Sequence, residues 1–176
     1  NFKSVTDNDP CTSGCTSTVS GTHNSDFIIN SGETVCIEEG TSASFNKIHI
    51  ESGGTLRVCG YASVNKYKNG SGEGTIMINE TGTMNLPKYN NEFTIENYGD
   101  LNYSGSGTIQ LNGALHNWGE ISSTITMINQ GSIINDGSFT TSKAFTNNPD
   151  ATFINNCEFI INKTGNSAFQ QNSDFT

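Results

Sequence analysis

A six-residue repeat constrains this chain more than any other feature. Apolar residues stand at every sixth position from Leu115 to Phe139, with Asn and Gly recurring at fixed offsets between them. After six residues a strand returns to the same face, whereas a helix would have turned by about 240°. The repeat therefore predicts an all-β chain. The same unit of two apolar residues flanking five spacers occupies 29–35, 50–56, 78–84, 95–101, 115–121, 127–133, 133–139, 153–159 and 169–175.

The spacing of these units predicts how the strands are arranged. Successive units begin 17 to 28 residues apart in the first two-thirds of the chain, which is about one coil of a parallel β-helix. Units that each bury few side chains must stack to form a core. We expect a parallel β-solenoid and favour right-handed coiling, although triangular coils of about 18 residues would also satisfy the repeat. A sandwich or barrel is the alternative, but hairpins do not predict identical motifs at coil spacing.

The domain organisation follows from where the repeat begins. We expect residues 1–26 to form an N-terminal cap with a Cys pair, and residues 27–176 to form the coils. The sequence begins without an initiator Met or a signal peptide and ends inside the repeat, so we expect a piece of a longer protein, truncated at its C-terminus. Asn and Gly at the corners tolerate the left-handed backbone of a sharp turn.

The parity of the repeat assigns its odd positions to the interior. The third position would then form an internal ladder, in which side-chain amides of successive coils hydrogen-bond to one another. Without these hydrogen bonds, each buried polar group would cost about 1–3 kcal/mol. Cys157 stands at the position usually held by Gly and should also face inward. The expected ladder residues are Asn97, Asn117, Asn129, Asn135 and Asn155.

Five cysteines suit an oxidising compartment. Zinc is the competing interpretation, but the CTSGC segment has no second Cys/His pair at finger spacing and the three His are scattered. We therefore expect disulfides among Cys11, Cys15, Cys36 and Cys59, with Cys157 left free. Cys36 and Cys59 both follow inward residues and lie about one coil apart, so a bridge between neighbouring coils could join them.

Charge excludes two classes of partner. The 176 residues carry a net charge of −9 with only eight Lys and Arg, which argues against nucleic acid and anionic membrane surfaces as partners. No apolar run approaches the roughly 20 residues of a membrane-spanning helix, so we expect no membrane insertion.

One local feature suggests a binding site. Tyr98 and Trp118 share the outward fourth position of successive units, and Asp100 and Glu120 share the sixth. Stacked coils would place the two rings side by side as an aromatic platform. Sugars bind such surfaces through their apolar C–H faces, with nearby polar groups supplying hydrogen bonds. The alternative is that the rings only cover their own turns.

The N-terminal third resembles a known family. The segments IINSGETVCI (28–37) and IESGGTLRVCG (50–60), within 16–60, are similar to the opening of large extracellular proteins of Bacteroidota. The resemblance implies β-helical coils, export through the outer membrane by the type 9 secretion system, and a place on the surface of a Gram-negative bacterium or outside it. Many such proteins are adhesins or take part in gliding motility. The C-terminal sorting domain of that family is not matched here.

These observations favour a non-enzymatic surface module, an adhesin or stalk that binds a glycan or a cell-surface partner and meets the secretion machinery during export. A fragment of a polysaccharide lyase or hydrolase is the alternative. A lyase needs a base and cations, for which Arg57 has Lys47, Lys66 and Lys68 nearby in sequence. A hydrolase needs two carboxylates about 5–9 Å apart, for which Glu96, Asp100 and Glu120 are candidates.

No catalytic residue, cofactor or metal site is assigned from the sequence. The run Asp7-Asn8-Asp9 is the one calcium-like feature, and it lacks the Gly and Glu that complete an EF-hand loop. We expect a solvated turn there.

Overall fold

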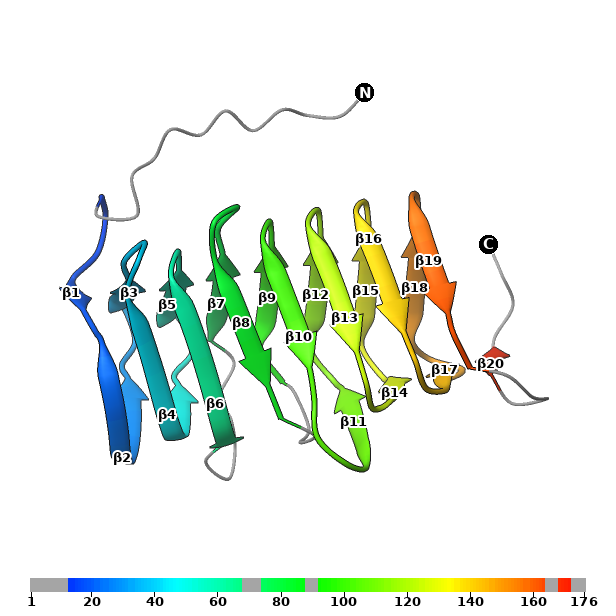
Figure 1. Cartoon of the computed structure of the whole chain (residues 1–176), viewed down its shortest axis with the longest axis horizontal. Coiled ribbons are helices and arrows are strands. Elements are labelled where there is room, and N and C mark those ends of the chain that lie inside the picture. Colours follow the sequence, from blue (N-terminus) through cyan, green and yellow to red (C-terminus); the bar gives the residue numbers. More distant parts are fainter. Residues whose placement is uncertain (1–12, 68–73, 88–91, 164–167, 172–176) are drawn as a thin grey trace.

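The chain forms a stack of parallel β coils. A computed structural model describes residues 13–67, 74–87, 92–163 and 168–171. Within these ranges every regular element is a strand, and every strand pairing is parallel. The strands follow one another along the long axis of the molecule (Figure 1). The predicted parallel β-solenoid is confirmed. No helix in these ranges is long and apolar enough to cross a membrane.

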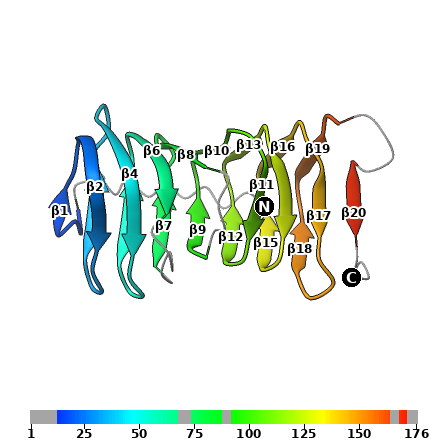
Figure 2. The same ribbon diagram turned by 90° about the horizontal axis from the view of Figure 1, so that it is seen from below.

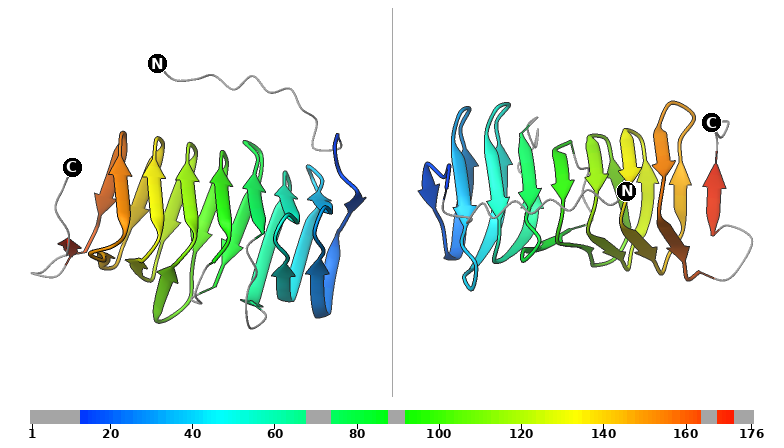
Figure 3. Two further views of the ribbon diagram at one scale, coloured as in Figure 1. Left: turned by 180° about the vertical axis from the view of Figure 1, so that it is seen from behind. Right: turned by 90° about the horizontal axis from the view of Figure 1, so that it is seen from above.

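Two eight-stranded sheets run the length of the rod. Figures 2 and 3 show the same succession of strands from below, behind and above. Sheet A contains β1 (Ser17–Thr18), β3 (Thr34–Ile37), β5 (Thr55–Val58), β7 (Thr75–Ile78), β9 (Thr94–Asn97), β12 (Ala114–Asn117), β15 (Ser132–Asn135) and β18 (Thr152–Asn155). Sheet B contains β2 (Gly21–Ile29), β4 (Ser42–Ile50), β6 (Tyr61–Tyr67), β8 (Thr83–Leu86), β10 (Asp100–Tyr103), β13 (Glu120–Ser123), β16 (Ser138–Thr141) and β19 (Glu158–Ile161).

A third sheet appears only in the C-terminal half. Sheet C has four strands, β11 (Thr108–Leu111), β14 (Thr126–Asn129), β17 (Phe145–Asn147) and β20 (Phe169–Gln171). The long strands of sheet B in the first coils, nine residues in β2 and β4, give way to four-residue strands from β8 onward. A coil of the rod therefore changes from one long and one short strand to three short strands. The first strands of both main sheets, β1 and β2, begin within residues 1–26, the range expected to be a cap.

The strand register defines a regular coil. In sheet A, equivalent residues of successive coils are separated by 18 residues (Leu115 to Ile133) to 21 residues (Val35 to Leu56). The spacing of 28 residues between the motifs at Ile50 and Ile78 does not measure a coil, because Ile50 ends a strand of sheet B whereas Ile78 ends a strand of sheet A. The six-residue unit occurs at more than one corner of a coil, so the distance between two units is not always the length of a coil.

The core follows the predicted parity. In the four-residue strands from β5 to β16, the second and fourth residues are buried and the first and third are not. Each inward residue stacks on its equivalent in the next coil, as Ile95 does on Leu115 and Leu115 on Ile133. Because the second residue of each of these strands is Ile, Leu, Met or Phe, one continuous hydrophobic core runs along the rod.

The buried amides form two ladders rather than one. Asn97, Asn117, Asn135 and Asn155 occupy the fourth residue of successive strands of sheet A, and each Nδ2 donates to the next Oδ1 at 2.7 Å. Asn155 is exposed rather than buried, because no further strand of sheet A lies beyond it in the described ranges. Asn129 lies instead in sheet C, where its Nδ2 donates to Asn147 Oδ1 at 2.7 Å. Placing Asn129 in a single ladder with the others was therefore wrong, because M-x-N at β14 and I-x-N at β15 mark different corners of the coil.

The glycines between sheets A and B serve close packing. A Cβ built on Gly99, Gly119 or Gly137 would lie 2.2 Å from a backbone oxygen of the preceding coil. None of these three glycines has a positive φ, and no described residue other than glycine has one. The expected left-handed backbone is therefore wrong for the corners between sheets A and B. Left-handed glycines occur at other turns, such as Gly32 and Gly53.

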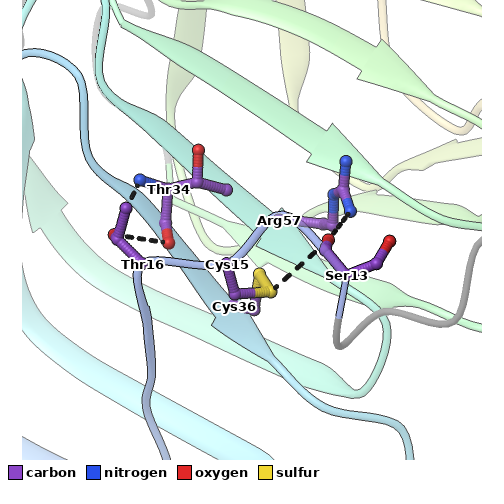
Figure 4. The surroundings of a disulfide bond; sticks show 6 residues. All are labelled: Ser13, Cys15, Thr16, Thr34, Cys36 and Arg57. Carbon is purple, nitrogen blue, oxygen red and sulfur yellow. Dashed lines mark hydrogen bonds between the residues drawn. A yellow bond between two sulfur atoms is a disulfide. The ribbon is translucent and has the colours of Figure 1, made fainter.

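The N-terminal segment is held to sheet A by a disulfide between Cys15 and Cys36 (Figure 4). The Arg57 guanidinium donates from Nη1 to Ser13 O at 2.8 Å beside it. A bridge between Cys36 and Cys59 was the wrong expectation, because Cys36 lies in register with Arg57, two residues before Cys59. Cys59 is also disulfide-bonded, and Cys11 lies outside the described residues.

Cys157 is free, as expected. It is exposed rather than inward, because it belongs to the last coil of sheets A and B and no further strand of these sheets lies beyond it in the described ranges. The same open end leaves Phe153, Phe159 and Phe169 only partly buried. A groove there is lined by Phe153, Ile154, Asn155, Asn156, Phe159, Ile161 and Phe169.

Candidate functional site

The outer corner between sheets A and B carries the candidate site. Tyr98 and Gly99 connect β9 to β10, and Trp118 and Gly119 connect β12 to β13. Because β9 pairs with β12 and β10 with β13 in register, the two corners lie directly beside each other. The backbone N–H of Trp118 donates to Asn97 O at 2.8 Å, which ties the second corner to the first.

The two rings stack on each other. The ring centroids of Tyr98 and Trp118 are 4.6 Å apart with an interplanar angle of 2°, close to the strand spacing of about 4.8 Å. The indole also stacks on the His116 imidazole, with centroids 3.4 Å apart. Trp118 nevertheless remains 38% exposed. We call Tyr98, His116 and Trp118 the aromatic ridge.

A polar chain supports the ridge from the next two coils. His116 Nε2 lies 2.6 Å from Asp136 Oδ2, and Asn156 Nδ2 donates to Asp136 Oδ1 at 2.7 Å. The hydrogen bond from His116, followed by the one from Asn156, lowers the pKa of Asp136 below its ordinary value of 3.8. Asp136 is therefore a carboxylate with partners on both oxygens.

Asp100 and Glu120 stand on the other side of the corner glycines. They are opposite each other in the pairing of β10 with β13, so their Cα atoms are about one strand spacing apart. Thr83 Oγ1 donates to Asp100 Oδ2 at 3.4 Å, whereas the Glu120 carboxylate has no hydrogen bond or ion pair with any described residue. Like charges directly opposite each other in a sheet are destabilising.

The candidate groups for an enzyme lie at several places. Arg57 is on β5 and binds Ser13, and Lys47 on β4 is 3.5 Å from Asp26 Oδ1. Lys66 lies on β6, and Lys68 is outside the described residues. Glu96 points outward on β9, in register with His116. Of these groups, Glu96 alone belongs to the coils that carry the aromatic ridge.

The described residues include no group of three or more His, Cys, Asp or Glu side chains that could hold a metal ion. Asp7-Asn8-Asp9, the calcium-like run, lies outside the described residues.

The sequence singled out Tyr98, Trp118, Asp100 and Glu120, and the structure brings all four together at one corner. His116, Asp136 and Asn156 were missed. His116 is the second residue of its unit and Asp136 the fourth residue of a later one, so their contact runs diagonally between coils. The only signal available was that Asp136 and Asn156 hold the same unit position as Tyr98 and Trp118.

The fold and this corner define a parallel β-solenoid with an exposed aromatic and acidic site on its flank. Comparison of the chain with protein-family models, curated proteins and solved structures found no match.

Proposed function

We propose that this chain is a non-enzymatic module of a secreted bacterial surface protein, exported by the type 9 route, and that it binds a glycan at the aromatic ridge. The rod would act as an adhesin or stalk, which sets a distance from the surface and presents the ridge to its ligand. The resemblance of residues 28–37 and 50–60 to secreted proteins of Bacteroidota supports export. The Cys15–Cys36 disulfide suits the proposed oxidising compartment.

The single observation that carries the binding proposal is the stack of Tyr98 on Trp118, in which Tyr98 is half-buried and Trp118 is exposed. The solenoid does not need these rings, because the hydrophobic core and the hydrogen bonds of the sheet A ladder form beneath them without any contribution from either ring. Large aromatic side chains that stay exposed leave apolar area in water at a cost, which ligand contact would recover.

The chemistry of the corner fits a sugar. The ridge offers apolar ring surface for the C–H groups of a pyranose, and Asp100 and Glu120 offer hydrogen-bond acceptors for its hydroxyl groups. Successive coils repeat about every 4.8 Å, so a saccharide chain lying along the rod would meet the Tyr98 and Trp118 corners together.

A glycan array followed by titration calorimetry tests this proposal. We expect the wild-type chain to bind at least one saccharide class, and Trp118→Ala to weaken that binding about tenfold, because the ring contact is worth on the order of 1 kcal/mol. Ile28→Ala is the matched control, since Ile28 is 43% exposed on β2 at the other end of the rod. Binding that is unchanged in Trp118→Ala, or no binding to any saccharide, contradicts the proposal.

A further inference from the structure

The charge around the aromatic ridge is of one sign. Residues 94–141 contain four carboxylates, Glu96, Asp100, Glu120 and Asp136, and neither Lys nor Arg. His116 is the only basic side chain in this stretch, and it lies against Asp136. A ligand at the ridge therefore approaches a surface with several negative charges.

In the part of the chain that the structure describes, neither Asp100 nor Glu120 forms an ion pair. Asp136 has His116 and Asn156 as partners. Asp100 accepts only a long hydrogen bond from Thr83 in the described part of the chain, and Glu120 has no side-chain partner there. They nevertheless lie in register on neighbouring strands, where two like charges repel.

Uncharged side chains occupy the same row of sheet B in the two flanking coils. Ser138 follows Glu120 in the register of sheet B, and Thr83 precedes Asp100. Glu158 stands beyond Ser138 in the same row and accepts a hydrogen bond from Ser138 Oγ at 2.9 Å. Among the described residues, Asp100 and Glu120 are therefore the one pair of carboxylates that lie opposite each other in this row, and they belong to the two coils that carry Tyr98 and Trp118. A favourable interaction with a ligand cation would offset the repulsion between them.

We propose that the saccharide bound at the ridge carries protonated amino groups, as a polymer of 2-amino sugars does. This inference rests on the proposed glycan binding and specifies its ligand. The ammonium group lies between the Asp100 and Glu120 carboxylates, which accept its hydrogen bonds. The apolar face of the sugar ring packs against Trp118 and Tyr98 across the corner glycines Gly99 and Gly119, which have no side chains to separate the two parts of the site.

Matched oligosaccharides test the charge preference. The probes are a β-1,4-linked glucosamine hexasaccharide, its fully N-acetylated counterpart and a uronate oligomer of similar length, at a pH at which the amine is protonated. We expect the amine form to bind about three- to tenfold more tightly than the acetylated form, as two exposed charge pairs allow. The uronate should bind most weakly. The advantage should shrink as salt is raised toward 1 M, where the Debye length falls to about 3 Å.

Two double variants locate the effect. Asp100→Asn with Glu120→Gln keeps size and removes both charges, so the two glucosamine-based probes should bind it equally, with the acetylated form bound as in wild type. Glu39→Gln with Asp150→Asn removes the same charge from exposed turns elsewhere and should keep the preference. This control separates the site from the general attraction of a chain with net charge −9 for a cation.

Each outcome distinguishes the inference from the proposed function. If both forms bind equally to wild type through Trp118, or the preference survives Asp100→Asn with Glu120→Gln, the ammonium inference is wrong and glycan binding stands. If no probe and no array saccharide binds, both are wrong.

Discussion

Replacement of Asn117 by Leu tests whether the amide ladder stabilises the rod. Asn117 is fully buried at the centre of the sheet A ladder. Its Oδ1 accepts from Asn97 at 2.7 Å, and its Nδ2 donates to Asn135 Oδ1 at 2.7 Å and to Ser138 O at 3.1 Å. Leu has a similar size and can make none of these hydrogen bonds.

The expected cost can be estimated bond by bond. The buried Asn135 Oδ1 loses its ladder donor, which costs about 1–3 kcal/mol. Asn97 Nδ2 keeps Glu120 O as a second acceptor at 3.0 Å, so its loss is smaller, about 0.5–1.5 kcal/mol. Part of this is offset by the apolar contacts of Leu. We expect Asn117→Leu to lower the free energy of unfolding by about 2–4 kcal/mol.

Asn97→Leu is the matched control at the start of the same ladder. The preceding coil has Ile78 at this position, and Asn97 Oδ1 is already buried without a partner. Leu there removes an unsatisfied oxygen and packs on Ile78, although it also removes a donor from Asn117. The net cost should be at least about 1 kcal/mol smaller than that of Asn117→Leu.

Urea unfolding under oxidising conditions measures both variants. Trp118 is the only tryptophan of the chain and follows Asn117 directly, so its fluorescence reports the coil that is changed. Far-UV circular dichroism measures the whole rod in parallel. Equal destabilisation of the two variants, or a greater effect of Asn97→Leu, would refute the account of the ladder.

Three further predictions concern the corner, the N-terminus and the polar chain. Gly119→Ala should destabilise the rod by about 1–3 kcal/mol in urea unfolding, because its Cβ would lie 2.2 Å from Gly99 O, whereas Gln130→Ala at an exposed turn should change it by less than about 0.5 kcal/mol. Peptide mapping should recover Cys15 linked to Cys36, and Cys15→Ser with Cys36→Ser should cost about 3 kcal/mol; a Cys36–Cys59 peptide would contradict the register. The lowered pKa of Asp136 means that its carboxylate adds stability above pH 3.8, which is lost as the pH falls through the folded-state pKa; the melting temperature of Asp136→Asn should therefore fall less than that of wild type below pH 3.8, and parallel curves would contradict this.

The six-residue periodicity predicted which side chains of each strand face inward and which face outward. The alternation of buried and exposed residues in strands such as Thr94–Asn97 and Ala114–Asn117 follows directly from the six-residue unit. The buried position of Asn97 and Asn117 and the nearness of Tyr98 to Trp118 follow from the same parity once the coils stack. These predictions needed no knowledge of the length of a coil.

The register between coils could not be read in this way. A coil contains more than one six-residue unit, so identical motifs at Met127 and Ile133 belong to different sheets. Asn129 was assigned to the wrong ladder for this reason. Cys36 was expected to meet Cys59 for a different reason, because the register within sheet A is shifted by two residues and places Cys36 beside Arg57. The F-x-N sequence at Phe145–Asn147 repeats the M-x-N of β14 and could have revealed the second ladder.

The same geometry explains why a site can be recognised on such a rod. In a solenoid each residue has its equivalents in the neighbouring coils as its nearest neighbours, so a row that serves the fold alone tends to repeat one residue type. The inward rows behave in this way, with apolar residues or Asn in successive coils. The row that contains Tyr98 and Trp118 continues with Asp136 and Asn156. The row that contains Asp100 and Glu120 has Thr83 before them, and Ser138 and then Glu158 after them. The stacked rings and the directly opposed carboxylates fall in the same two coils. The partly exposed rings and the opposed carboxylates both cost stability at this one corner, and the proposed ligand binding would account for the two costs together.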